Sequence, residues 1–211
     1  MQSRSALPLP DVPARSLAAP GLEPMTVRRA NPVDASGVSR LRMLLRVEES
    51  GSILEPDEPA PSLQEEIARI AAQDRDPGLL TLVAESAGQL VGWLEFSGGE
   101  HRRTAHRGWV VLAVAAGYRR LGIGRALLEA LHDWASRHRL IEQVALHCAE
   151  NNAPALALYR SLGYVEEGRS RRALKLAPGR YADVVQLCRD LREGGPAVMP
   201  GPSTDRHRTG R

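Results

Sequence analysis

The stretch of this chain best suited to chemistry is a pair of closely spaced glycines that precedes a helix-like pattern. Gly122 and Gly124 follow residues 109–114, an apolar run typical of a buried strand. Without side chains, the glycines would let a bulky anion approach the backbone. The first N–H groups of a helix have no intrahelical partner and lie at the positive end of the helix dipole. The segment therefore predicts a binding site for a phosphate-bearing ligand.

The residues after the glycines are patterned as an amphipathic helix. Apolar side chains recur at helical spacing, at Ile123, Ala126, Leu127, Ala130, Leu131, Trp134 and Ala135. Other phosphate-binding motifs fit less well, because a P-loop requires Gly-Lys-Ser/Thr and a dinucleotide fingerprint requires a third glycine where Leu127 stands. Glu142 lies near the distance expected of a ribose-binding acid, so a dinucleotide-binding protein remains the less favoured alternative.

Arginines on both sides of the glycines narrow the choice of ligand. The order Arg119-x-x-Gly122-x-Gly124 resembles the coenzyme A pyrophosphate loop of the GNAT superfamily of N-acetyltransferases, which reads Arg/Gln-x-x-Gly-x-Gly/Ala. The resemblance implies that acetyl-coenzyme A is the co-substrate. It assigns coenzyme binding to Arg119, Arg120, Leu121, Gly122, Ile123, Gly124, Arg125 and Ala126.

A second motif follows in the expected order. Residues 152–164 begin with an N-cap asparagine and a first-turn proline and end at a glycine, which is typical of a short helix. They resemble the GNAT pattern Asn-x-x-Ala-x-x-Leu-Tyr-x-x-x-Gly-Phe/Tyr at Asn152, Ala155, Leu158, Tyr159, Gly163 and Tyr164. Because a strand-like run separates the two motifs, the resemblance extends over roughly residues 25 to 192.

The implied reaction moves an acetyl group from the thioester to a primary amine of a small molecule or peptide, by direct attack in a ternary complex. An alkylammonium with a pKa near 10.4 is neutral in only about 1 molecule in 2,500 at pH 7, so a base is needed. The resemblance places the oxyanion donors on the backbone of Leu112, Ala113 and Val114. It also suggests that Asn152 contacts the pantetheine arm and that Tyr159 protonates the leaving thiolate and lies against the coenzyme. A coenzyme-binding module without catalysis is the alternative.

The general base is the least determined part of this site. Many relatives carry a glutamate on the central strand, but residues 109–114 contain no acid. Glu95 on the preceding strand and His106 just before the central strand are the nearest groups with suitable chemistry. The acceptor amine, the length of the acyl group and the oligomeric state, including a homodimer, stay open.

Composition limits the other classes of function. The chain has 211 residues, 43% of them hydrophobic, a formal net charge of +3 and a single phenylalanine. These values favour one soluble, cytoplasmic domain and disfavour a nucleic-acid or membrane partner, because no aromatic stacking platform and no long apolar segment is present. Cys148 and Cys188 are expected to be buried free thiols. No metal site is expected, because the spacings of the cysteines and histidines match no metal-ligand pattern.

We therefore expect a GNAT-like α/β domain over residues 25–193, with disordered tails at 1–24 and 194–211. The fold class implied is a mixed, mostly antiparallel sheet of about seven strands flanked by about four helices. A hairpin is expected around residues 86–89 and a parallel crossover from residues 109–114 through the glycine-led helix to residues 143–148. Ser62 and Glu65 form a capping-box pattern for a helix whose inward residues would be Leu63, Ile67, Ile70 and Ala71.

Overall fold

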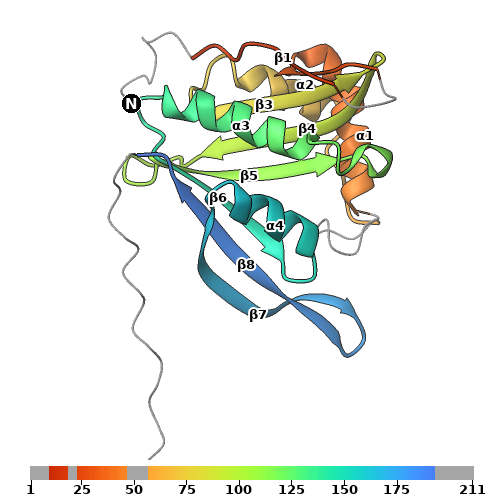
Figure 1. Cartoon of the computed structure of the whole chain (residues 1–211), viewed down its shortest axis with the longest axis vertical. Helices are drawn as coiled ribbons and strands as arrows, with labels where there is room; N and C mark the ends of the chain where they lie inside the picture. The colour runs from red at the N-terminus through yellow and green to blue at the C-terminus, as the bar shows by residue number, and fades with distance from the viewer. Residues whose placement is uncertain (1–9, 19–22, 47–56, 193–211) are drawn as a thin grey trace, which may run out of the picture.

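The computed structural model of the chain describes residues 10–18, 23–46 and 57–192. In chain order, the strands and α-helices are β1 (Arg15–Leu17), β2 (Met25–Arg29), α1 (Ala35–Arg46), α2 (Leu63–Ala72), β3 (Leu79–Ser86), β4 (Gln89–Gly98), β5 (Arg107–Val114), α3 (Ile123–Ser136), β6 (Gln143–Ala149), α4 (Ala153–Ser161), β7 (Val165–Ala177) and β8 (Arg180–Asp190) (Figure 1). Short 3-10 turns at Pro32–Asp34 and Ala116–Tyr118 precede α1 and α3.

The eight strands of the described residues form one sheet in the order β1-β2-β3-β4-β5-β6-β8-β7. Only β5 and β6 pair in parallel, and α3 makes the crossover between them that a parallel pair requires. The expected α/β class, with a mixed and mostly antiparallel sheet and four α-helices, is confirmed. The sheet has one strand more than the seven expected, because β1 lies in a segment that the sequence assigns to a tail.

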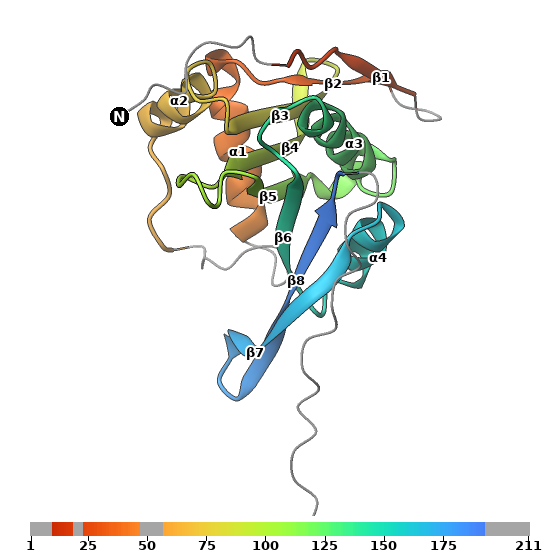
Figure 2. The ribbon, with the colours of Figure 1, turned by 90° about the vertical axis from the view of Figure 1, so that its left-hand side faces the viewer.

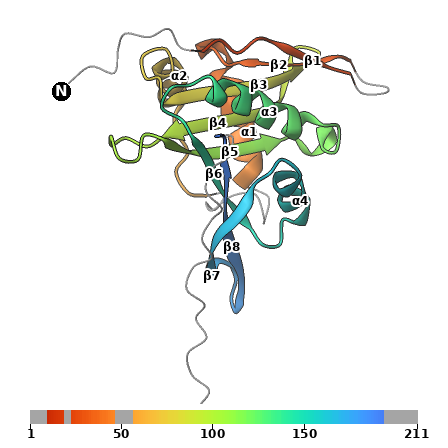
Figure 3. The same ribbon diagram turned by 60° about the vertical axis from the view of Figure 1, so that its left-hand side comes forward.

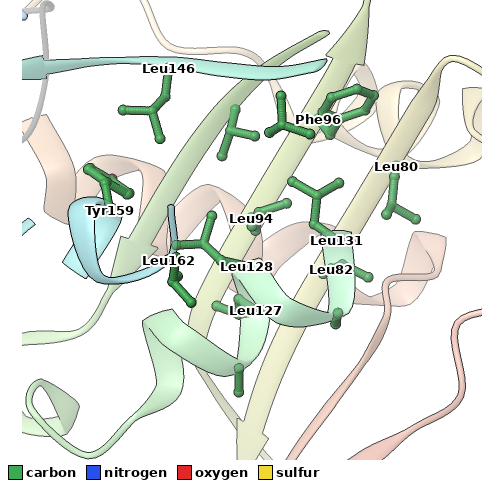
Figure 4. Close-up of a cluster of buried hydrophobic side chains, with 14 of the residues drawn as sticks. Leu80, Leu82, Leu94, Phe96, Leu127, Leu128, Leu131, Leu146, Tyr159 and Leu162 are labelled. Atoms are coloured by element: carbon green, nitrogen blue, oxygen red, sulfur yellow. The ribbon is translucent and has the colours of Figure 1, made fainter. Parts of the chain in front are cut away.

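Helices α3 and α4 cover one face of the sheet (Figure 2). Every apolar position of α3 expected to face inward is buried. These side chains pack on register partners from neighbouring strands, among them Leu82, Leu94, Leu80 and Phe96 (Figure 4). The large apolar area removed from water on this face is the main stabilising contribution of the larger core.

Helices α1 and α2 cover part of the opposite face. Val83, Trp93 and Ala113 are neighbours in the register of β3, β4 and β5, and they form a second core cluster with residues of the two helices. The Ser62 capping box is confirmed, since the Glu65 N–H donates to Ser62 Oγ at 3.2 Å. The expected inward face of α2 is partly wrong.

Ile70 of α2 is fully buried, but Leu63 and Ile67 are 52% and 38% exposed. Glu66 occupies the inward face instead and is only 1% exposed. Arg42 of α1 donates to both Glu66 carboxylate oxygens at 3.1 Å, which compensates for burying the charge. Helical periodicity alone predicts an apolar residue on the inward face of α2. The ion pair with Arg42 explains why Glu66 lies there instead.

The expected tail over residues 1–24 is wrong for the part that the structure describes. Strand β1 pairs with β2, and Val12 is 8% exposed within the larger core cluster. The folded domain therefore begins before residue 25. Residues 1–9, 19–22 and 193–211, including the expected C-terminal tail, lie outside the described residues.

A largely buried polar network connects α3 to β8 and to Tyr164, which precedes β7. Arg189 of β8 donates to Nδ1 of His132 at 2.7 Å, and His132 Nε2 lies 2.9 Å from the Tyr164 hydroxyl. Because a guanidinium can only donate, Nδ1 must accept, and Nε2–H donates to the Tyr164 oxygen. Burial, and secondarily the charge of Arg189, lower the pKa of His132 to about 3, so the ring is neutral at physiological pH.

Other expectations about the chain can be checked directly. Cys148 and Cys188 are buried free thiols, as expected. The β3–β4 hairpin turns at Ala87 and Gly88, which both have positive φ, confirming the expected hairpin. Within the described ranges, no helix combines the length and apolar character needed to cross a membrane.

Candidate functional site

The sheet separates between β5 and β6, the one parallel pair of strands within the described residues. β5 and β6 pair only from Arg107 to Trp109 on β5 and from Gln143 to Ala145 on β6. Beyond these residues, β5 continues to Val114 beside β4, and β6 continues to Ala149 beside β8. The two strands therefore diverge, as Figures 1 and 3 show. In the part of the chain that the structure describes, the backbone of β5 on the side of β6 has no strand partner along this opening.

Strand alternation decides which backbone groups face the opening. The Ala115 N–H donates to the Val91 carbonyl of β4 at 2.9 Å. Since backbone groups alternate in direction along a strand, Ala113 also directs its N–H toward β4, whereas Leu112 and Val114 direct theirs away from it. Of the three residues expected to supply oxyanion donors, Leu112 and Val114 are the ones that fit, and Ala113 does not.

The loop after β5 brings the first turn of α3 to the same opening. Arg120 and Gly122 have φ values of 64° and 84°, so the loop contains two left-handed residues. Gly122 is the N-cap of α3, and its carbonyl accepts from the Ala126 N–H at 2.9 Å. The N–H groups of Ile123, Gly124 and Arg125 precede this first helical hydrogen bond. They form the positive end of the helix and are suited to bind an anion.

The two glycines have different surroundings. A Cβ on Gly124 would lie 3.1 Å from Leu158 Cδ2 of α4 and 3.7 Å from Leu112 Cδ2 of β5. Gly124 therefore also allows α3 to pack closely against α4. Gly122 faces the other way, toward Leu17 of β1, and is exposed.

The three arginines beside the glycines are exposed, but two of them are held by protein contacts. Arg119 Nε donates to the Val114 carbonyl at 3.0 Å, which closes the end of β5. Arg125 donates to Ser161 Oγ of α4 at 2.7 Å. Arg120 carries the left-handed backbone described above. Backbone N–H groups are therefore better placed than any single guanidinium to hold a phosphate.

The second motif lies next to this loop through α4. Asn152 is the N-cap of α4, and its side chain accepts from the Ala155 N–H at 3.3 Å, as expected for the cap. Tyr159 is 8% exposed, and its ring lies 5.8 Å from the ring of Tyr164. Tyr159 lies at the edge of the buried cluster near Leu146 of β6 (Figure 4). Burial, and secondarily Cys148, raise the pKa of the Tyr159 phenol, so the hydroxyl keeps its proton at neutral pH.

The two candidate bases lie in different places. Glu95 is the register partner of Val111, which borders the opening, but Glu95 itself lies on β4, one strand away, and its side chain faces α1 and α2. Its carboxylate accepts from Arg42 Nη2 at 2.8 Å and from Arg69 Nη1 at 3.3 Å. His106 precedes the end of β5 that is paired with β6, and its carbonyl accepts from the Glu142 N–H at 2.7 Å. At about 3.3 Å per residue, His106 is roughly 20 Å along the strand from Leu112.

The central strand carries an exposed apolar surface that its sequence does not predict. Trp109 and Val111 are 39% and 47% exposed, on the same face of β5 as Ala113. α1 packs against β4 and covers Ala113, but it leaves these two side chains uncovered. The ring of His147 on β6 stacks on Trp109 at a centroid distance of 4.6 Å. An apolar run cannot reveal this surface, because exposure depends on where α1 ends.

Comparison with known proteins agrees with this geometry. Residues 47–164, more than half of the chain, match the model of the Acetyltransferase (GNAT) family. The L-amino acid N-acetyltransferase AaaT of Escherichia coli K12 is 26% identical over 54% of this chain and 69% of its own length. An N-alpha-acetyltransferase of Sulfurisphaera tokodaii is 39% identical over 40% of this chain, and the match spans only 55% of that protein.

A solved structure gives the same fold. The structure of yncA, a putative acetyltransferase from Salmonella typhimurium with its cofactor acetyl-CoA, has a TM-score of 0.71 and 21% identity, and the match covers 83% of this chain and 99% of that one. This likeness concerns the fold, whereas the family model rests on the sequence. With an eight-stranded sheet that opens beside a glycine-led helix, the chain belongs to the GNAT family of N-acetyltransferases.

Proposed function

We propose that the chain transfers the acetyl group of acetyl-coenzyme A to a primary amine of a small molecule or peptide, by direct attack in a ternary complex. The observation that carries the proposal is the divergence of β5 from β6 next to the first turn of α3. This arrangement offers strand N–H groups for a thioester and helix N–H groups for a pyrophosphate. Family membership favours coenzyme A over the dinucleotide alternative.

The coenzyme would be held mainly by backbone groups of the loop and of α3. The N–H groups of Ile123, Gly124 and Arg125 would face the pyrophosphate, with Arg119, Arg120 and Arg125 adding positive charge. Asn152, at the start of α4, would contact the pantetheine arm of the coenzyme. The cofactor named for the Salmonella structure is acetyl-CoA, which supports this choice of co-substrate.

The chemical step needs three groups from this chain. The amine nitrogen attacks the thioester carbonyl carbon, and the resulting oxyanion would accept hydrogen bonds from the Leu112 and Val114 N–H groups. The C–S bond then breaks, and the Tyr159 hydroxyl donates its proton to the thiolate. The proton of the amine passes to a base, for which Glu95 is better placed than His106 because its register partner, Val111, borders the opening, whereas His106 precedes the paired end of β5.

The acceptor would approach from the face of the sheet that α1 and α2 only partly cover. Trp109 and Val111 expose apolar surface there, with Glu95 as the register partner of Val111. Exposed apolar side chains on an internal strand are typical of a binding surface. The named relatives act on L-amino acids and on an alpha amino group, which supports an acceptor of this kind.

The experiment that tests the function is a coupled thiol-release assay. Purified protein is incubated with acetyl-coenzyme A and a panel of free amino acids and of peptides with free N-termini. We expect thiol release that requires an amine and that is absent with the N-acetylated form of the same acceptor. If the protein binds coenzyme A tightly but releases no thiol with any amine, the alternative of a non-catalytic coenzyme-binding module holds.

A further inference from the structure

The N-terminal segment of the chain lies along α3, the helix that carries the phosphate-binding loop (Figures 2 and 3). Arg15 of β1 forms an ion pair with Asp133 of α3. Arg137, just after α3, donates to the Asp11 carbonyl at 2.8 Å, and Val12 is buried in the larger core cluster. Pairing of β1 with β2 also holds the segment in place. The segment is therefore fixed to the helix at several points.

The last residue of β1 reaches the loop itself. Leu17 Cδ2 lies 3.9 Å from the position that a Cβ on Gly122 would take, which is ordinary van der Waals distance. Leu17 and Leu121 are both partly buried against the larger core cluster. A side chain from the start of the chain thus packs beside the N-cap of α3, more than one hundred residues later in the sequence.

The conformation of this loop needs external support. Arg120, which is not glycine, has a φ of 64°, a left-handed conformation that is unfavourable for a residue with a side chain unless the surroundings hold it. Gly122 at 84° adds a second left-handed position. On one side, Arg119 Nε fixes the loop to the Val114 carbonyl. On the other side, Leu17 Cδ2 is the nearest atom, chain neighbours aside, to the position that a Cβ on Gly122 would take.

We propose that Leu17 is a positioning residue for coenzyme binding, so that β1 holds the loop of residues 119–122 in the shape that presents the α3 N–H groups. This inference rests on the proposed function, because it assumes that the loop binds the pyrophosphate. Leu17 does not touch the reacting atoms. Its effect is to keep the binding-competent loop populated before the coenzyme arrives.

The test compares Leu17→Ala with Ser16→Ala in the full chain. Ser16 is the exposed neighbour on β1, so its variant controls for any change in this strand. If Leu17→Ala reduces the competent fraction of the loop to about a tenth to a third, the Kd of coenzyme A rises about three- to tenfold. The KM for acetyl-coenzyme A should rise by the same factor, with kcat and the KM for the amine unchanged.

Two further measurements separate positioning from general destabilisation. S-Acetylpantetheine lacks the pyrophosphate, so the rate of its reaction should be the same in Leu17→Ala and in the wild type. Leu17→Met, which restores apolar volume, should restore coenzyme A affinity. Calorimetry gives the Kd values, and thermal unfolding checks that the variants are folded.

The outcomes distinguish this inference from the proposed function. A wild-type protein that binds no coenzyme A overturns the proposed function, and the inference falls with it. A wild-type protein that binds coenzyme A, beside a folded Leu17→Ala variant with equal affinity, overturns the inference alone. Equal losses with acetyl-coenzyme A and S-acetylpantetheine would also overturn it, because they would indicate a general structural role.

Discussion

At the scale of single residues, the environment of Tyr159 keeps its hydroxyl protonated. The phenol is almost fully buried, and its raised pKa keeps the proton on the oxygen at the pH of the reaction. The thiolate of coenzyme A, whose thiol has a pKa near that of free cysteine at about 8.5, is a weaker base than a phenolate, so proton transfer to the free thiolate is uphill. The hydroxyl would therefore act by proton donation in the transition state as the C–S bond breaks.

Replacing Tyr159 with phenylalanine tests this role. The ring and its packing remain, so we expect little change in coenzyme A affinity and a fall in kcat of about 10² to 10⁴, the usual range for a lost general acid. Tyr164→Phe is the matched control, because it removes a hydroxyl from the neighbouring ring, which bonds to His132 instead. Near-normal kcat in Tyr159→Phe would restrict Tyr159 to packing against the coenzyme.

Single substitutions also distinguish the two candidate bases, Glu95 and His106. Glu95→Gln removes the carboxylate beside Val111, and we expect kcat/KM to fall about 10²-fold or more. His106→Gln should leave the rate within about threefold of the wild type, because His106 lies at the paired end of β5. Rates measured across pH in both variants check this. A larger loss in the His106 variant would reverse the assignment.

At the scale of elements, local sequence predicts the pieces that carry their own signals. The α3 and α4 limits follow from caps, glycines and periodicity, and the inward face of α3 is entirely as expected. The inward turn of Glu66 depends on Arg42, which lies 24 residues earlier in the chain. β1 has only three residues, too few for a period, and its stability comes from β2 and α3. Such long-range contacts leave no local pattern to read.

The link between α3 and β8 makes a pH-dependent prediction. The pKa of His132 is about 3 in the folded protein and near 6.5 when unfolded. Between these values the unfolded chain binds more protons, so the free energy of unfolding decreases as the pH falls below about 6.5. The full contribution is present above that pH and is lost progressively toward pH 3.

Urea unfolding of the wild type and His132→Gln at about pH 7.5 and about pH 5 measures this contribution. At 1.36 kcal/mol per pH unit, the stability advantage of the wild type should shrink by roughly 2 kcal/mol between the two conditions. Carboxylates elsewhere titrate equally in both proteins and cancel. A constant difference between the two proteins would show that His132 does not remain neutral in the folded state.

At the scale of the whole molecule, the site is an opening in a sheet, framed by parts that are distant in sequence. The sequence predicted the loop, the crossover and the two motifs, because each is encoded by neighbouring residues. It did not predict where β5 and β6 separate, nor that Trp109 and Val111 would be exposed. The first feature depends on where the pairing of β5 with β6 stops, and the second depends on how much of β5 is covered by α1. Neither can be predicted from the residues of β5 alone.

The loop before α3 is the proposed binding site for the pyrophosphate of coenzyme A. Calorimetric titration of coenzyme A into Gly122→Val, with Gly179→Val as a control, tests it most directly. Both glycines have a positive φ, 84° and 77°, so both variants impose similar backbone strain, but Gly179 lies in the turn between β7 and β8. We predict that affinity falls at least about tenfold in the folded Gly122 variant and is unchanged in the Gly179 variant. Equal coenzyme A affinity in wild type and folded Gly122→Val would contradict the claim.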